Sequence, residues 1–227
     1  MTHDNRPIGI FDSGYGGLTI LQDIRQRLPQ YDYLYLGDNA RAPYGPRSFD
    51  VVYEYTLEAV QELFGRGCEL VILACNTASA KALRNIQQND LPNIDSEKRV
   101  LGVIRPSAEI IGQYSEANTI GVLATQGTVN SQSYVLEIAK FSPQCKVYQH
   151  ACPMWVPLIE NNNHETKAGR EFIREDVEKL MAMNTRIDTI VLGCTHYPVL
   201  KEYIETIVPE GVKVISPLQE QSFRYTL

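Results

Sequence analysis

The sequence lacks the features that mark several large classes of protein. Its 227 residues contain no run of lysine or arginine, and the formal net charge is −6. This balance argues against nucleic-acid binding, because phosphates bind to basic surfaces. No apolar stretch has the length of a membrane span, and the short apolar run that begins at Ile8 is interrupted by Asp12, unlike a signal peptide. We therefore expect a cytoplasmic globular protein that binds neither nucleic acid nor membrane.

The cysteines do not have the spacing of a zinc site or of a disulfide framework. There are five, an odd number, and none forms a C-x-x-C pair. We therefore expect no metal site and no disulfide bonds. Cys68, Cys145 and Cys152 are interpreted as small buried apolar side chains. Cys75 and Cys194 occupy a different kind of position.

Apolar, β-rich runs alternate with segments of helical periodicity, which is typical of an α/β protein with a mostly parallel sheet. Strands are predicted at 8–11, 33–36, 70–73, 100–103, 119–123, 146–149, 189–192 and 213–215. Helices are predicted at 18–28, 49–64, 78–88, 106–114, 132–140, 167–181 and 199–207. The turn-rich stretch "PNIDSEK" at 92–98 is a candidate crossing between two halves.

The two halves of the sequence echo each other. "IGIFDSGYGG" at Ile8 is answered by "IGVLATQGTV" at Ile120, and "LVILACNTA" at Leu70 by "TIVLGCTHY" at Thr189. The offsets are about 110–120 residues, which indicates two related units. We expect two pseudo-symmetric α/β domains with mostly parallel sheets, 1–97 plus 209–227 and 98–208, and an active site in the cleft between them.

Cys75 and Cys194 each follow an apolar strand directly, at the end of a parallel strand where α/β proteins bind ligands. Asp12 falls at an equivalent position. A helix is expected to begin soon after each, and its N-terminus favours a thiolate as well as an anionic ligand. Short polar side chains suited to a carboxylate follow the two cysteines: Asn76, Thr77 and Thr195.

Two thiols on opposite sides of a ligand have a specific chemical use. Inverting a carbon centre requires a proton to leave one face and another to arrive at the opposite face. One base cannot easily serve both faces, whereas two thiol/thiolate groups can. Because the Cα–H of an amino acid is only weakly acidic, the site must also stabilise the carbanion, with donors arranged around the substrate carboxylate.

At these residues the sequence resembles the cofactor-independent glutamate racemases of the aspartate/glutamate racemase superfamily. The resemblance runs from about Pro7 to about Ile215 and rests on "GIFDSGYGGLTIL", "DNARAPYG", "ACNTAS", "GVLATQGTV", "VPLIE" and "GCTHYP", in the family's order. It implies interconversion of L- and D-glutamate for bacterial peptidoglycan, with no pyridoxal phosphate, other cofactor or metal. A racemase of aspartate or a related substrate, a non-catalytic ligand-binding relative, and assembly as a homodimer stay open.

The resemblance also implies roles for individual residues. Cys75 would exchange the proton of the D-enantiomer and Cys194 that of the L-enantiomer. Asp12 resembles the carboxylate that assists the first thiol, and His196 and Glu160 resemble the groups that assist the second. Asp12, His196 and further residues match positions that line the substrate pocket: Ser13, Pro43, Tyr44, Gly45, Asn76, Thr77, Thr128 and Thr195.

Simpler structural interpretations of these residues stay open. They are a buried strand-end cysteine for Cys75, a helix cap for Asp12 and Thr128, a backbone partner for His196, a surface carboxylate for Glu160, and a turn for Tyr44. After Ile215 the segment "PLQEQSFRYTL" lacks the pattern of the long amphipathic helix that the family has there. We therefore expect a shortened tail that leaves apolar side chains of the first domain uncovered, at roughly 1.5–3 kcal/mol each.

Overall fold

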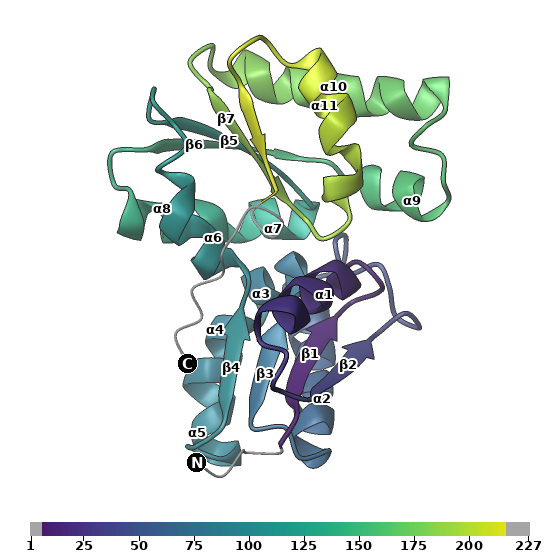
Figure 1. Cartoon of the computed structure of the whole chain (residues 1–227), viewed down its shortest axis with the longest axis vertical. Helices are drawn as coiled ribbons and strands as arrows, with labels where there is room; N and C mark the ends of the chain where they lie inside the picture. Colours follow the sequence, from purple (N-terminus) through teal and green to yellow (C-terminus); the bar gives the residue numbers. More distant parts are fainter. Residues whose placement is uncertain (1–5, 217–227) are drawn as a thin grey trace. The chain divides into compact units, whose positions relative to one another are not determined.

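The computed structural model describes residues 6–216, and the chain divides into two units after Val103 (Figure 1). Within the described residues, each unit is built on one four-stranded sheet in which every strand pair is parallel. Helices flank both sheets. The predicted class, an α/β protein of two domains with parallel sheets, is confirmed.

The first sheet has the strand order β2-β1-β3-β4. Its strands are β1 Ile8–Asp12, β2 Tyr33–Gly37, β3 Leu70–Leu73 and β4 Arg99–Gly102. Asp12 pairs with Gly37, and Leu73 pairs with Gly102. Because the strands are parallel, their carboxyl ends meet at one edge of the sheet, and the residues after β1 and β3 are brought together there.

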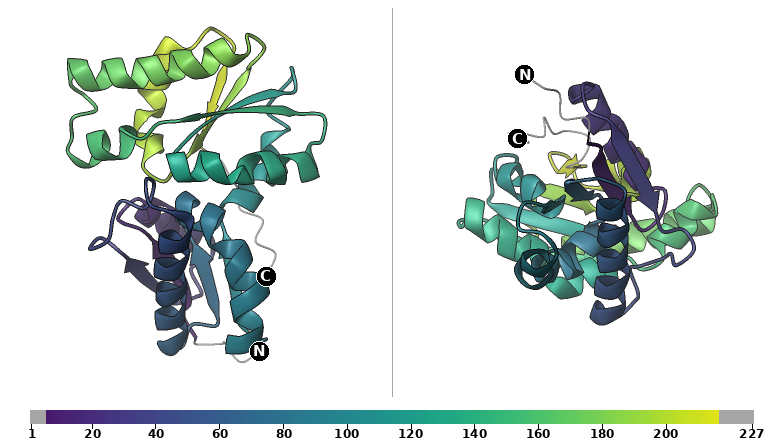
Figure 2. Two further views of the ribbon diagram at one scale, coloured as in Figure 1. Left: turned by 180° about the vertical axis from the view of Figure 1, so that it is seen from behind. Right: turned by 90° about the horizontal axis from the view of Figure 1, so that it is seen from below.

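The helices of the first unit are α1 Gly17–Arg27, α2 Phe49–Gly65, α3 Asn76–Lys81, α4 Leu83–Asn85, the π-helical turn η1 Ile86–Asp90, and α5 Leu91–Ile94. Opposite views show α1 on one face of the sheet and α2 on the other (Figure 1, and Figure 2, left). The helix predicted at 78–88 is instead a series of short segments that begins at Asn76.

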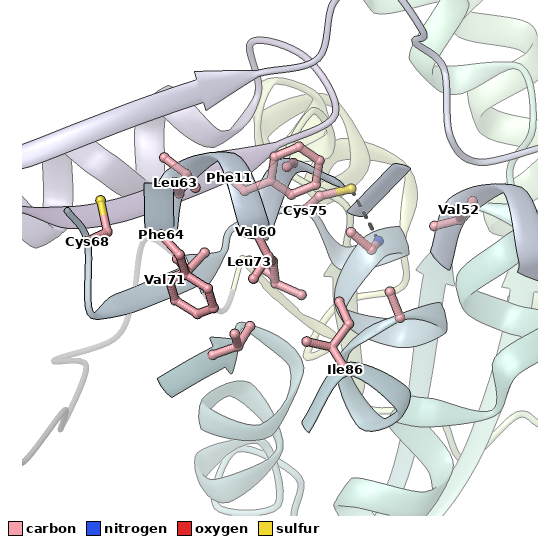
Figure 3. Packing of buried hydrophobic residues seen from close by; sticks show 14 of the residues in the cluster. Phe11, Val52, Val60, Leu63, Phe64, Cys68, Val71, Leu73, Cys75 and Ile86 are labelled. Carbon is pink, nitrogen blue, oxygen red and sulfur yellow. Dashed lines mark hydrogen bonds between the residues drawn. The ribbon is translucent and has the colours of Figure 1, made fainter. Parts of the chain in front are cut away.

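The core of the first unit lies between α2 and the sheet (Figure 3). Val52, Val60 and Leu63 of α2 are fully buried, at the spacing that places side chains on one face of a helix. They pack in one cluster with Phe11 of β1, Leu73 of β3, and other buried residues that include Cys75. The helix begins after Ser48, whose side chain accepts a hydrogen bond from the N–H of Val51.

The second sheet has the strand order β6-β5-β7-β8. Its strands are β5 Thr119–Ala124, β6 Lys146–Ala151, β7 Thr189–Gly193 and β8 Lys213–Ile215. The expected domain division differs from this pairing at both ends. Residues 99–102, expected in the second domain, form β4 of the first sheet, and 213–215, expected in the first, pair with β7. Consecutive strands joined by a short helical connection usually lie side by side, as β3 and β4 do and as β7 and β8 do. Residues 217–227, with the expected shortened tail, lie outside the described residues.

The helices of the second unit are α6 Ile104–Ile111, α7 Gln126–Ser131, α8 Ser133–Phe141, α9 Trp155–Glu160, α10 Lys167–Met183, the 3₁₀ turn η2 Tyr197–Leu200, and α11 Lys201–Ile207. Figures 1 and 2 show α10 and α11 on one face of the sheet, with α6 and α8 on the other. The sequence missed α9, in which Pro157 lies in the first turn, where its missing N–H removes no helical hydrogen bond.

The buried stripe of α10 contains Ile173, Val177 and Leu180. It packs on the sheet at a point where β5 carries a glycine: a Cβ at Gly121 would lie 2.8 Å from Leu180 Cδ2. A larger residue at this position would force Leu180 to shift, so the close approach of helix and strand favours glycine. No helix within residues 6–216 combines the length and the apolar character that crossing a bilayer would need.

Candidate active site

Asp12 ends β1 as a fully buried carboxylate. Its Oδ2 accepts a hydrogen bond of 2.9 Å from the N–H of Gly14. The cap position of α1 is occupied by Gly16, so Asp12 does not cap that helix. The first residue of the helix, Gly17, instead packs against the Asp12 side chain: a Cβ at Gly17 would lie 2.6 Å from Asp12 Cβ. The glycines of the "GYGG" segment thus let α1 approach the end of β1.

Cys75 follows β3 and is the N-cap residue of α3. Its Sγ accepts a hydrogen bond of 3.4 Å from the N–H of Ala78 and lies 3.3 Å from Ser13 Oγ. The side chain is only 5% exposed and belongs to the core cluster shown in Figure 3, where a dashed line marks the bond to Ala78. Cys75 is therefore both the buried strand-end residue of the simpler interpretation and a hydrogen-bonded thiol.

The pKa of the Cys75 thiol is raised from its ordinary value of 9.0 to about 11. Burial is the larger cause, and the negative charge of Asp12 adds to it. The hydrogen bonds from Ser13 and Ala78 act in the opposite direction, as the sequence analysis expected for a helix N-terminus, but burial and Asp12 outweigh them. At neutral pH Cys75 is therefore a thiol, and the expected gain in thiolate does not occur at this cysteine.

The "DNARAPYG" loop is anchored by Asp38. Its Oδ2 accepts hydrogen bonds from the Tyr44 hydroxyl at 2.5 Å and from Arg41 Nε at 2.6 Å. The N–H of Asp38 donates to the carbonyl of Asp12 at 3.0 Å, which joins the loop to the end of β1. Tyr44 is buried, Gly45 is half-buried and Pro43 is exposed. The Tyr44 hydroxyl thus holds the loop, and the turn interpretation describes only part of its role.

Asn76 and Thr77 are the first two residues of α3, and each is 3% exposed. They follow the thiol directly, so their backbone and side-chain groups belong to the same edge of the sheet as Asp12 and Ser13. The structure therefore brings together the residues of the first unit that were predicted from β1 and β3: Asp12, Ser13, Cys75, Asn76 and Thr77.

The second thiol, Cys194, follows β7 and is 6% exposed. Its Sγ lies 3.9 Å from His196 Nδ1, which is also 3.4 Å from Thr195 Oγ1. His196 Nε2 lies 3.2 Å from Glu160 Oε1, at the end of α9. An ionised carboxylate only accepts hydrogen bonds, so Nε2 carries the proton and Nδ1 of the neutral ring is an acceptor.

This arrangement shows which groups surround His196 and Glu160. The ring nitrogens of His196 face the Cys194, Thr195 and Glu160 side chains rather than a backbone carbonyl. The Glu160 side chain is 38% exposed, so it is a surface carboxylate that also holds the imidazole. The imidazole can accept a proton from the Cys194 thiol while Glu160 stabilises the cation that results.

Thr128 is fully buried in the first turn of α7, but it is not the cap. The cap is Thr125, whose Oγ1 accepts a hydrogen bond of 3.3 Å from the N–H of Thr128 and donates one of 3.1 Å to Thr128 Oγ1. Thr125 follows β5, the strand beside β7. The two hydroxyls therefore lie at the carboxyl edge of the second sheet, as Cys194 does.

Two tyrosines near the thiols were missed by the sequence analysis. The hydroxyl of Tyr35, on β2, donates to the carbonyl of Gly14 at 2.8 Å and holds the turn that follows Asp12. Tyr134, on α8, is buried, and a Cβ at Gly193 would lie 3.0 Å from its Cε2. Burial raises the pKa of both hydroxyls, and at Tyr35 the negative charge of Asp12 adds to this effect. Neither tyrosine lies in a motif, so only the strand pairing and helix packing reveal them.

One group of side chains among residues 6–216 has the composition of a metal site. The ligand atoms of His150, Cys152 and Asp176 lie within 4.8 Å of one another. The Asp176 carboxylate, however, already has a ring nitrogen at each oxygen. His150 Nε2 lies 2.9 Å from Oδ1, and Trp155 Nε1 donates to Oδ2 at 2.9 Å. We interpret the group as a hydrogen-bonded network.

Comparison with known proteins identifies the class. The model of the Asp/Glu/hydantoin racemase family matches residues 18–221, and the chain belongs to this family. A glutamate racemase of Lactococcus lactis is 39% identical over 93% of this chain and 75% of its own length. The crystal structure of a glutamate racemase isoform from Bacillus anthracis has a TM-score of 0.87 and 36% identity, and the match covers 96% of this chain and 79% of that one.

A third similar protein carries a ligand. The glutamate racemase of Francisella tularensis, solved in complex with D-glutamate, has a TM-score of 0.81 and 35% identity over 95% of this chain and 77% of that one. These comparisons confirm the resemblance stated from the sequence and the expected enzyme class, an amino-acid racemase.

Proposed function

We propose that this protein interconverts L- and D-glutamate without a cofactor, with Cys75 and Cys194 as the two acid/base groups. The supporting observation is that each unit ends an equivalent buried strand in a cysteine with its own polar partners. The identity of about two-fifths to a glutamate racemase supports the choice of substrate, since that protein covers nearly the whole chain. In the proposal the two thiols serve opposite faces of the substrate Cα.

In the direction from L to D, Cys194 acts as the base. His196 Nδ1, 3.9 Å from Sγ, accepts the thiol proton and leaves a thiolate. The thiolate takes the Cα proton of L-glutamate, and Cys75 gives its own proton to the opposite face of the carbanion. Cys75 suits this step, because its raised pKa keeps it protonated at neutral pH. The step ends with a Cys194 thiol, a protonated His196, a Cys75 thiolate and D-glutamate, and proton exchange with solvent then returns Cys75 to the thiol and His196 to the neutral form.

In the direction from D to L, Cys75 must be a thiolate when substrate is bound. The charge of Asp12 contributes to its high pKa in the free protein. A substrate ammonium group beside Asp12 would neutralise that charge and favour the thiolate. We infer that substrate binding itself activates Cys75. The Asp12 carboxylate then accepts the proton that leaves the thiol, while the ammonium group keeps its charge.

The remaining polar groups are assigned to substrate binding. Ser13, Asn76, Thr77 and Thr195 adjoin the thiols and offer donors to the substrate carboxylates, which must be held while charge develops on Cα. Pro43, Gly45 and Thr128 complete the assigned pocket. The product D-glutamate would serve peptidoglycan synthesis.

The test is racemisation in heavy water. The protein is incubated separately with L-glutamate, D-glutamate, L-aspartate and D-aspartate, while circular dichroism follows the optical signal and proton NMR follows the Cα–H. We expect the signal to decay to zero with both glutamate enantiomers only, and each product to contain solvent deuterium. Decay with aspartate alone would assign the other substrate, and binding without decay would contradict catalysis.

A further inference from the structure

The Asp176 carboxylate connects three elements of the second unit. Asp176 lies on α10 with its side chain 14% exposed. One oxygen faces His150 Nε2 on β6, and the other accepts the N–H of Trp155 on α9, both at 2.9 Å. Lys179 Nζ lies 3.6 Å from Asp176 Oδ1, and the Lys179 side chain is 57% exposed. This ion pair therefore stabilises the carboxylate only weakly. The two ring nitrogens are the principal partners of the carboxylate.

Trp155 is the first residue of α9 and is fully buried. Its ring packs against Tyr197, with centroids 4.8 Å apart and planes inclined by 55°. The Tyr197 hydroxyl donates to the Cys152 carbonyl at 3.0 Å, and the backbone N–H of Trp155 donates to the same carbonyl at 3.3 Å. Asp176 thus holds the indole ring through its N–H, and that ring packs against Tyr197.

This aromatic pair adjoins both groups that assist Cys194. Trp155 begins the helix that Glu160 ends, and Tyr197 directly follows His196. The helix α9 has six residues, which is a length of about 9 Å. A small tilt at its first residue therefore displaces Glu160 at its other end. The Glu160 side chain is 38% exposed, and the described contact that holds its carboxylate is the one with His196 Nε2.

We propose that Asp176 is a positioning residue for the second thiol: through Trp155 it sets α9, and with it the Glu160–His196 pair beside Cys194. The inference rests on the proposed function, because it assigns Asp176 to the half-reaction at Cys194. Asp176 does not contact the thiol or the imidazole and takes no part in proton transfer. A buried indole N–H needs an acceptor of some kind. Because the Asp176 carboxylate also contacts His150 on β6, it fixes the start of α9 relative to the sheet as well.

The test is the Asp176→Asn variant, which preserves size but presents an amide N–H₂ to one of two donors. We expect kcat to fall roughly ten-fold, the cost of one lost buried hydrogen bond, with KM nearly unchanged. The decisive readout is the isotope effect on kcat/KM with Cα-deuterated substrates. It should rise with deuterated L-glutamate, because proton removal by Cys194 becomes slower. It should fall with deuterated D-glutamate, because return of the proton from Cys194 then limits the reaction.

A second variant and a control keep the result interpretable. Trp155→Phe retains the ring against Tyr197 but loses the N–H, and we expect the same asymmetry at smaller size. Asp90→Asn is the matched control, because Asp90 accepts a hydrogen bond from Tyr53 in the first unit at 2.8 Å. It should change neither isotope effect. Thermal unfolding and circular dichroism verify that each variant folds.

Isotope effects that stay unchanged in both Asp176→Asn and Trp155→Phe would overturn the inference, even if activity fell, since a loss of folded protein changes the rate alone. If Asp176→Asn does not fold, Trp155→Phe decides. Failure of the proposed function gives a different result: the unaltered protein would not racemise glutamate.

Discussion

The two thiols occupy equivalent strand ends but have different neighbours. Cys75 lies beside a hydroxyl and a helix N–H, in a buried site near a carboxylate that raises its pKa. Cys194 lies 3.9 Å from an imidazole, and the imidazole separates it from the carboxylate of Glu160. In the proposed mechanism, two sheets of the same strand order therefore carry two different acid/base systems. In this proposal, chemically different groups exchange the proton on the two faces of the substrate, although the strands that carry the thiols are equivalent.

The largest effect should come from removing either thiol. Cys75→Ser and Cys194→Ser should each slow racemisation by about 10²–10⁴-fold, since a hydroxyl is a far weaker acid/base group. Circular dichroism with L- and D-glutamate measures the loss. The variants should differ in one respect: Cys75→Ser should still exchange the Cα proton of L-glutamate with solvent, and Cys194→Ser that of D-glutamate. Turnover close to that of the unaltered protein would contradict the two-base assignment.

Substitution of the side chains proposed to assist the two thiols should lower activity less, and the two substitutions should change the isotope effects of opposite enantiomers. We expect His196→Asn and Asp12→Asn each to lower kcat by about 10–100-fold, within the range of acid/base contributions. His196→Asn should increase the isotope effect with Cα-deuterated L-glutamate, and Asp12→Asn the effect with deuterated D-glutamate. Kinetics with the two labelled enantiomers makes the comparison. Equal changes in both variants would show that the two systems are not separate.

The close approach of α1 to Asp12 predicts a packing defect. Gly17→Ala would place a Cβ 2.6 Å from Asp12 Cβ, and overpacking costs about 1–3 kcal/mol. We expect a lower thermal midpoint and a raised KM, because the buried carboxylate must shift. Gly65→Ala is the control, since a Cβ there meets nothing within 4 Å. Midpoints that agree between the two variants would contradict the tight packing.

The last prediction concerns alkaline stability. The Cys75 thiol has a higher pKa in the folded protein, about 11, than its ordinary value of 9.0. Its contribution to stability is therefore complete below pH 9 and is lost as the pH rises towards 11, by about 2–3 kcal/mol. Urea unfolding of the unaltered protein and of Cys75→Ala across this range measures the difference. Parallel curves would show that Cys75 titrates normally.

The sequence was most informative about features that depend on a few neighbouring residues, such as strands. Buried parallel strands are continuous apolar runs, so Leu70–Leu73 and Lys213–Ile215 were predicted with their observed ends. Helix boundaries were less accurate. The helix predicted at 132–140 is observed as α8 at Ser133–Phe141, but α7 at Gln126–Ser131, which precedes it, was missed; Gln132 separates the two in a left-handed conformation with φ of 56°. Nothing in that residue type signals the break.

The candidate site shows the same limit. Residues that follow strands, such as Cys75 and Cys194, could be predicted because the strand ends are visible in the sequence. Tyr35 and Asp176 could not, because each acts through a partner on another element. The assignment of 213–215 to the first domain failed for a related reason, since strand order is decided by packing across the sheet.

Cys75 is packed among Phe11, Leu73 and Ala78 in the interior of the first unit (Figure 3). A reagent that alkylated this sulfur would therefore disturb the packing of the core as well as block the thiol. The added atoms would have to displace core side chains, so modification should loosen the whole unit. Inactivation at this residue should be accompanied by increased susceptibility to proteases.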